Sequence, residues 1–135
     1  MTYVSITRLR LRDEAFLDEF MTDSLAAHAQ AGAAAGNLGL DLLVGAANTF
    51  WTKSTWTDRA AMRAFMTAGE HAATMPKLRA WCDEAHVAHW EQESAALPTW
   101  EEAHRQLLAV GRRSAVDHPT PAHESMDLPP PVLAD

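Results

Sequence analysis

The sequence predicts an α+β fold in which four strands form one antiparallel sheet and helices cover one face of that sheet. Three observations lead to this prediction. Strand-like and helix-like runs follow one another in the order β-α-β-β-α-β. A short turn joins the two middle strands, whereas a helical segment links the strands of each outer pair. A well-capped helix follows the last strand. This order is that of the ferredoxin-like, split-βαβ arrangement with an extra C-terminal helix.

The first half of the chain supplies one strand, one helix and a hairpin. Tyr3–Leu11 alternates in character and is rich in β-branched residues, which is typical of a strand. Asp13 is a favourable N-cap, because its carboxylate can accept a backbone N–H of the next helix. Ala26–Ala35 continues that helix, since alanine has the highest helix propensity. Two further strands are predicted, over Leu38–Ala47 and Thr49–Trp56.

The second half begins with a broken helix. Asp58 caps it, and Gly69 interrupts it. Because proline is tolerated only in a first helical turn, Pro76 indicates a fresh helix with Thr74 as its N-cap. Ala85–Glu91 is predicted to be the fourth strand.

The C-terminal part contains one more predicted helix and a proline-rich segment. Thr99 and Glu102 form a capping box at the start of the helix Trp100–Val110. We expect the folded domain to comprise residues 1–112. Residues 113–135 carry five of the seven prolines and no apolar periodicity, so we expect a disordered or wrapping segment that contributes little to folding.

Composition excludes several classes of partner. The net charge of −7 argues against a nucleic-acid partner, which requires a clustered basic surface. No apolar run approaches the roughly 18 residues of a membrane helix, and the N-terminus reads as a strand rather than a signal peptide. The single cysteine, Cys82, excludes an intramolecular disulfide and a thiolate metal cluster. We therefore expect a cytoplasmic protein without nucleic-acid or membrane partners.

The predicted layers also suggest a homodimer. Helices on one face of an antiparallel sheet leave the other face bare, and the strands carry apolar residues on both faces. A monomer rarely tolerates such an apolar patch, and two-fold pairing is the commonest way to cover it. We therefore expect two chains to pair sheet to sheet.

Five segments carry distinctive motifs: Phe50-Trp-Thr-Lys-Ser-Thr-Trp-Thr-Asp, Met62-Arg-Ala-Phe-Met, Gly69-Glu-His, Met75-Pro-Lys-Leu-Arg-Ala-Trp and His89-Trp-Glu. These motifs resemble those of the dimeric α/β-barrel superfamily, with the closest similarity to small proteins related to spheroidene monooxygenase and to antibiotic-biosynthesis monooxygenases. The resemblance spans Tyr3 to Ala103 and implies a ferredoxin-like fold. It also implies a class of proteins that includes cofactor-free oxygenases, haem proteins, isomerases and cyclases. The Asn-Trp-His trio of the haem-degrading branch does not fall on matching positions here, so the resemblance transfers no catalytic residue.

His71 is the first candidate for catalysis. Imidazole titrates near neutral pH and is also the commonest neutral ligand of metals and haem. Gly69 gives the backbone just before it the freedom to direct the side chain into a pocket. The structural alternative is a histidine that packs at a helix end. No other metal ligand is predicted, and the cofactor is either absent or, as the main alternative, haem bound through His71.

His89 and Arg8 are the second and third candidates. His86 and His89 point to opposite faces of a strand, so they do not form a metal pair. His89 shares a face with Glu91, and the two could act as a general base or form a structural hydrogen bond. Arg8 shares a face with Val4 and Ile6, where an inward cation could hold a carboxylate or an enolate oxygen.

Four aromatic side chains are predicted to bind substrate, since ligand pockets are mostly apolar with few polar groups. Plain core or dimer packing is the alternative for each. These residues are Trp56, Trp90, Phe20 and Phe65.

Three functions follow, and the resemblance decides their order. The first is a monooxygenase-type oxidoreductase acting on an apolar or aromatic small molecule in a cavity between sheet and helices. The second is a non-redox cyclase, isomerase or dehydratase of natural-product biosynthesis that uses a histidine base. The third is a non-catalytic binding homodimer. Because fold-level analogy is weak evidence for a reaction, the sequence leaves the substrate open.

Overall fold

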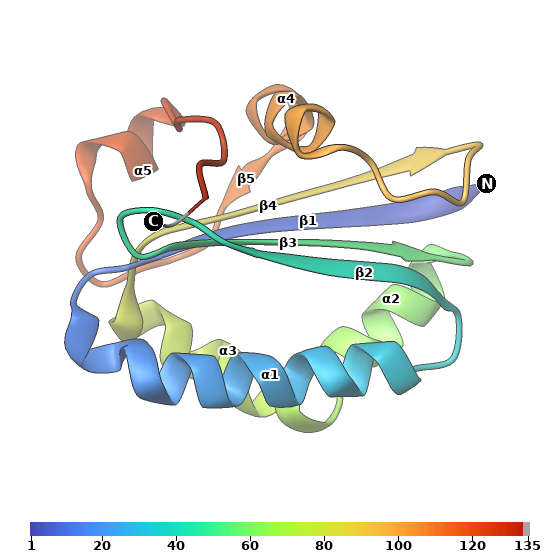
Figure 1. Cartoon of the computed structure of the whole chain (residues 1–135), viewed down its shortest axis with the longest axis horizontal. Helices are drawn as coiled ribbons and strands as arrows, with labels where there is room; N and C mark the ends of the chain where they lie inside the picture. Colours follow the sequence, from blue (N-terminus) through green and yellow to red (C-terminus); the bar gives the residue numbers. More distant parts are fainter. Residues whose placement is uncertain (134–135) are drawn as a thin grey trace.

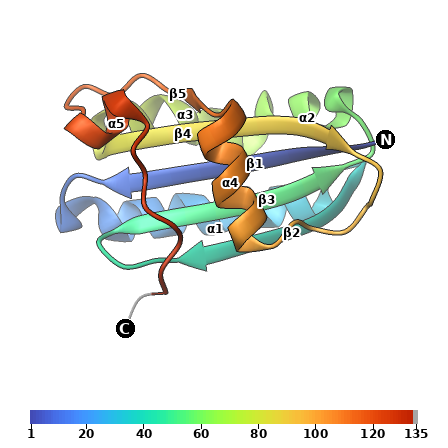
Figure 2. The same ribbon diagram turned by 90° about the horizontal axis from the view of Figure 1, so that it is seen from above.

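The computed structural model of the chain describes residues 1–133 and has a five-stranded antiparallel sheet as its middle layer (Figures 1 and 2). The strands lie in the order β2-β3-β1-β4-β5, so β1 is central and β2 is an edge. The first four strands confirm the ferredoxin-like arrangement, to which β5 adds a short edge. The strands are β1 (Thr2–Leu11), β2 (Asn37–Val44), β3 (Thr49–Trp56), β4 (Cys82–Gln92) and β5 (Arg112–Arg113).

Three helices cover one face of the sheet, below the strands in Figure 1: α1 (Leu17–Ala33), α2 (Arg59–Met66) and α3 (Gly69–Trp81). A short 3₁₀ turn precedes α1. Both predicted aspartate caps are present. Asp13 Oδ1 accepts a hydrogen bond from the N–H of Ala15, and Asp58 Oδ1 accepts one from the N–H of Ala61, each at 2.8 Å.

The prediction of a fresh helix at Thr74 is wrong. α3 runs without interruption from Gly69 to Trp81, with Pro76 inside it. Gly69 has a φ of 55°, which lets the chain change direction and begin α3 at this residue. The helix therefore starts well before Pro76. Thr74 and Leu78 lie buried on its inner side. Their packing offsets the hydrogen bond that Pro76 cannot make.

The opposite face of the sheet is also covered. α4 (Trp100–Val110) crosses it obliquely, and α5 (Pro121–Ser125) lies beside β4 (Figure 2). Leu107 of α4 and Leu128 after α5 join the strand residues Ile6 and Trp51 in one apolar core. The expectation of a bare second face is therefore wrong, and the sheet-to-sheet pairing that it suggested would require α4 and α5 to move away. A homodimer stays a prediction.

The proline-rich segment is ordered as far as Leu133. His123 and Leu128 are each only 3% exposed, and the N–H of Ala46 donates to the main-chain oxygen of Val132 at 2.8 Å. Residues 113–133 thus pack against the rest of the domain, as the wrapping alternative describes, and the domain boundary at residue 112 stays a prediction. Few apolar residues are needed to hold this segment in place, because two or three of its side chains pack into the core that the other elements form. None of the helices in residues 1–133 has both the length and the apolar character needed to cross a membrane.

The two faces of β1 differ in a way that locates the site. Val4, Ile6 and Arg8 point toward α4 and α5 and are buried. Ser5 and Thr7 point toward α1–α3 and keep partial exposure, because they line a cavity there. The odd-numbered residues Ser5 and Thr7 of β1 therefore border the cavity under α1–α3.

Candidate functional site

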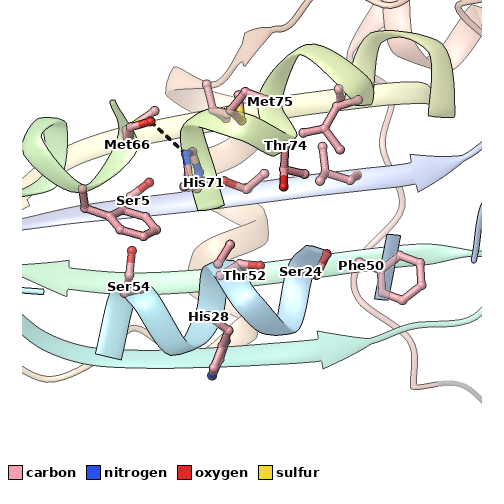
Figure 3. A pocket seen from close by; sticks show the side chains of 18 of the residues that line it. Ser5, Ser24, His28, Phe50, Thr52, Ser54, Met66, His71, Thr74 and Met75 are labelled. Atoms are coloured by element: carbon pink, nitrogen blue, oxygen red, sulfur yellow. Dashed lines mark hydrogen bonds between the residues drawn. The ribbon is translucent and has the colours of Figure 1, made fainter. Parts of the chain in front are cut away.

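A cavity of about 190 Å³ lies between the sheet and α1–α3. The sheet contributes a row of hydroxyl groups from β1 and β3, and the helices contribute mainly apolar side chains (Figure 3). This volume lies below the roughly 300–1,000 Å³ of pockets for drug-sized ligands, so the cavity suits a smaller molecule. The hydroxyl row consists of Ser5, Thr7, Thr52 and Ser54.

His71 lies at the start of α3 and lines this cavity. Its Nδ1 is 3.1 Å from the main-chain oxygen of Met66 (Figure 3). Because a carbonyl oxygen can only accept, Nδ1 carries the proton and Nε2 keeps its lone pair. Burial lowers the pKa of His71, and the bond to Met66 opposes that shift only in part. His71 is therefore a neutral imidazole at pH 7, with Nε2 available as a base.

Gln30 of α1 holds the helix break that positions His71. Its Oε1 accepts the backbone N–H of His71 at 2.8 Å, and its Nε2 donates to the main-chain oxygens of Ala68 and Phe65 at 2.8 and 3.2 Å. A Cβ on residue 69 would lie within 3.3 Å of the Gln30 amide. The absence of a side chain on Gly69 therefore allows the backbone to approach Gln30 closely. Sequence reasoning missed Gln30. The available signal was a lone amide within the alanine-rich stretch of α1.

His89 of β4 lines the same cavity, on the sheet side. Burial lowers its pKa, and the charges of Arg112 and Arg59 lower it further. Its Nε2 is buried and has no hydrogen-bond partner among residues 1–133. A buried polar atom without a partner costs free energy, which a ligand with a matching group would recover. The predicted couple with Glu91 does not form in this part of the chain, where no hydrogen bond joins the two side chains.

Three of the four predicted aromatic residues line the cavity. Trp56 and Phe65 stack at 5.2 Å between ring centroids, and Phe65 lies 4.7 Å from the His71 ring. Phe20 of α1 lies against Phe50 at 4.6 Å. The Phe65 ring thus lies against the imidazole, and the other rings line the same cavity, which favours a flat apolar ligand.

The remaining two predicted site residues lie on the other face of the sheet. Arg8 is 2% exposed, and its Nη1 makes an ion pair with Glu84 Oε1 at 2.7 Å. Trp90 packs against the core under α4. Arg8 therefore cannot contact a ligand held by His71, because successive β1 side chains point to opposite faces. His86, directly opposite Arg8 on β4, also faces away from this cavity.

The side chains around His71 determine whether the cavity can hold a metal ion or haem. Residues 1–133 contain no group of three or more His, Cys, Asp or Glu side chains that could hold a metal ion. His71 Nε2 carries the lone pair that a haem ligand needs. A drug-sized ligand occupies a pocket of roughly 300–1,000 Å³, and haem is larger than such a ligand. The cavity beside His71 measures only about 190 Å³. The residues around His71 thus do not fit a haem group.

The comparisons with known proteins identify the family and the fold. The profile of DUF3291, described as a domain of unknown function, matches residues 12–118. No protein with a curated description matches the sequence.

Several solved structures share the architecture, among them one named as an oxygenase and one named as an antibiotic biosynthesis monooxygenase. SnoaB, a cofactor-independent oxygenase from Streptomyces nogalater, is 17% identical with a TM-score of 0.57, over 69% of this chain and 94% of that one. A protein solved as an antibiotic biosynthesis monooxygenase is 18% identical with a TM-score of 0.60, over 70% and 100%. Rv0793 from Mycobacterium tuberculosis is 12% identical with a TM-score of 0.63, over 70% and 97%. At these identities the similarity establishes the fold alone.

Proposed function

We propose that this chain, which belongs to the DUF3291 family, is a small-molecule-modifying enzyme of the monooxygenase type. It would work without a cofactor on a small apolar or aromatic substrate. One observation carries the proposal. His71 is held neutral with a free Nε2 lone pair in a cavity walled by Trp56 and Phe65. The fold shared with SnoaB, which is named as a cofactor-independent oxygenase, supports the same chemistry.

The first step is removal of a proton from the substrate. His71 Nε2 takes a proton from an acidic C–H, while Nδ1–H stays bonded to the Met66 oxygen and keeps the ring oriented. The resulting carbanion is delocalised into an adjacent carbonyl or phenol. His89 and the row of hydroxyl groups can donate hydrogen bonds to that oxygen as its charge develops.

The second step uses dioxygen as the oxidant. The carbanion supplies the electrons, so the substrate takes up one oxygen atom and the other leaves as water. For a methylene group the balance is CH₂ + O₂ → C=O + H₂O, with no external reductant. The protonated His71 can return its proton to the departing hydroxide. The apolar wall excludes water and protects the carbanion from simple reprotonation.

The size of the cavity limits the substrate. About 190 Å³ suits a molecule of one or two fused rings rather than a large polycyclic one. The row of hydroxyl groups lies on the sheet wall, whereas aromatic rings come from both walls: Phe50 and Trp56 from β3, and Phe20 and Phe65 from the helices. A flat molecule with oxygen substituents along one edge therefore matches the hydroxyl row and the aromatic rings.

Oxygen consumption with a panel of small enolisable aromatic ketones and phenols tests this proposal. We expect stoichiometric uptake of one O₂ per substrate, without added metal, flavin or haem, and a colourless protein with no Soret band. A substrate that is converted without oxygen uptake would instead assign the non-redox alternative, in which the same histidine base catalyses isomerisation or cyclisation. A Soret band in the purified protein would contradict the cofactor-free reaction.

A further inference from the structure

A second cavity, of about 330 Å³, lies on the opposite face of the sheet. Arg8 and Trp51 form its floor, and the turn between β2 and β3 borders it. The segment that follows α5 crosses over this region on its way to that turn (Figure 2). It closes the cavity with Pro129, Pro130 and Val132. The volume falls within the roughly 300–1,000 Å³ range of small-molecule sites.

Arg8, which lines this cavity, has an unused hydrogen-bond donor in its guanidinium group. Nη1 donates to Glu84 Oε1 at 2.7 Å, whereas Nε is buried and has no hydrogen-bond partner in the described part of the chain. A side chain that is 2% exposed cannot turn to water to satisfy this group. The unpartnered N–H marks a position where an acceptor is missing.

The neighbours of Arg8 fix its orientation. The second oxygen of Glu84 accepts a hydrogen bond from Thr120 Oγ1 at 2.7 Å, so the carboxylate is held from both sides. Burial opposes ionisation of Glu84, but the hydrogen bonds and charges of Arg8, Thr120 and Arg10 outweigh it and lower its pKa. The Arg8 Cζ lies 5.9 Å from the Trp51 ring centroid. The guanidinium is therefore a rigid, preorganised plane.

From this geometry we propose that the second cavity binds a small carboxylic acid with an apolar body, its carboxylate on the Nε edge of Arg8. Arginine only donates hydrogen bonds, so the ligand must present an acceptor there. The parallel N–H groups along one edge of a guanidinium match the two oxygens of a carboxylate. Alanine, proline and tryptophan side chains form most of the remaining lining, which suits an apolar ligand body.

Charge does not oppose this ligand. Arg8 pairs with Glu84, and Arg10 Nη1 pairs with Asp83 at 2.8 Å, so the arginines balance the two acids. The carboxylate enters a neutral site and is held by directed hydrogen bonds. The site is separate from the His71 cavity, since the sheet lies between them.

Titration of the ¹⁵N-labelled full chain with benzoate, and in parallel with benzamide, tests the proposal. The signals to follow are the Arg8 Nε–H and the Trp51 indole N–H in ¹H–¹⁵N spectra. We expect benzoate to shift both with a Kd on the order of 1 mM, as is usual for a ligand of this size. Benzamide lacks the charged oxygens and should bind at least about tenfold more weakly. Equal binding of the two probes, or no shift at either signal, would overturn the proposal.

Two variants and one control locate the binding. Ala122→Leu places a larger side chain in the second cavity and leaves Arg8 intact, so benzoate should no longer shift the Arg8 signal. Arg8→Lys keeps the charge beside Glu84 but removes the planar fork, so binding should weaken about tenfold. Ala27→Leu fills the His71 cavity instead and should leave the benzoate-induced shifts of Arg8 and Trp51 unchanged. If Ala122→Leu binds benzoate like the wild type, this cavity is not the site.

Discussion

His71 Nδ1 and the main-chain oxygen of Met66 lie 3.1 Å apart, so the last residue of α2 sets the tautomer of the second residue after Gly69 in α3. The bond crosses the helix break that Gly69 creates. A backbone carbonyl oxygen can only accept a hydrogen bond, so Nδ1 keeps its proton as long as the junction between α2 and α3 is intact. The proposed base therefore depends on the geometry of two helices and not on a neighbouring carboxylate.

Replacing His71 with alanine should lower the rate of substrate conversion by about 10²–10⁴-fold, the usual contribution of a general base. The fold should remain, with a loss of stability on the order of 1 kcal/mol. His28→Ala is the matched control, because His28 lines the same cavity and makes no hydrogen bond within residues 1–133. If both variants turn over substrate like the wild type, His71 is a structural residue.

The pH–rate profile should report His71 directly. Its lowered pKa means that the base is already deprotonated at pH 7, so kcat/KM should be level at neutral pH. The rate should fall as the pH drops through a value below about 6.5, the ordinary imidazole pKa. A midpoint above that value would mean that another group controls the acid limb.

Folding stability should also decrease in acid, for a different reason. Burial lowers the pKa of His86, whose Nε2 lies 3.1 Å from the main-chain oxygen of His123. Below about pH 6.5 the unfolded chain binds a proton at this position that the folded chain does not, so the free energy of unfolding falls as the pH decreases. Urea denaturation at pH 7.5 and 5.5 measures this change. His86→Gln should reduce the difference between the two pH values.

The range from pH 7.5 to 5.5 separates the effect of His86 on stability from that of Glu84. The pKa of Glu84 lies below its ordinary value, so its stabilisation is complete above about pH 4.3 and is lost only in stronger acid. His71 and His89 also have lowered pKa values and contribute in the same direction as His86. A stability that does not change between pH 7.5 and 5.5 would contradict the burial of all three imidazoles.

Removal of the residues after Ser114 should destabilise the fold. The deletion takes Leu128 out of the core and breaks the hydrogen bonds of Thr120 and His123 with β4. Loss of Leu128 burial alone costs about 2–5 kcal/mol. We expect the melting temperature to fall by roughly 10 °C or more, since about 1 kcal/mol shifts Tm by 2–8 °C in domains of this size range.

Two point variants accompany this deletion. Leu128→Ala should reproduce a large part of the loss, because Leu128 is buried, whereas Val132→Ser should have little effect, because Val132 is exposed. A truncated chain that melts within a few degrees of the full chain would show that α4 alone covers the second face.

The edge strand β2 carries its own protection against pairing. Asp41 Oδ1 accepts the N–H of Leu42 at 2.9 Å, and Asn37 Nδ2 donates to the oxygen of Gly39 at 3.2 Å. These side chains occupy backbone groups that another strand could use, although Leu38 and Val44 are 47% and 43% exposed nearby. Asp41→Ala should therefore increase self-association, as measured by light scattering at micromolar concentrations.

Glu101→Ala, which removes an exposed carboxylate from α4, is the control for this effect. The same measurement on the wild type tests the predicted homodimer. If Asp41→Ala and the wild type have the same mass, Asp41 does not guard the edge. A wild-type monomer near 15 kDa would end the homodimer prediction.

Local patterns predicted the ferredoxin-like core, because caps and strand alternation depend on residues that are close in sequence. Asp13, Asp58 and Gly69 all act as expected. Which face of β1 would meet the helices was not readable, because both faces carry mixed residues. The structure shows that Thr7 faces the cavity and Arg8 does not. The packing of Leu128 could not be predicted, because a single apolar side chain gives no periodic pattern in the sequence. Its contacts are with elements far away in the chain.

The alternation along β1 has a consequence for how this protein can change over evolutionary time. Ser5 and Thr7, at odd positions, border the space under α1–α3, whereas Val4 and Ile6, at even positions, are fully buried in the core under α4. A saturation mutagenesis library of β1, scored once for turnover and once for abundance, should therefore separate by parity. Related proteins would then acquire new ligands by changes at Ser5 and Thr7, while Val4 and Ile6 stay fixed.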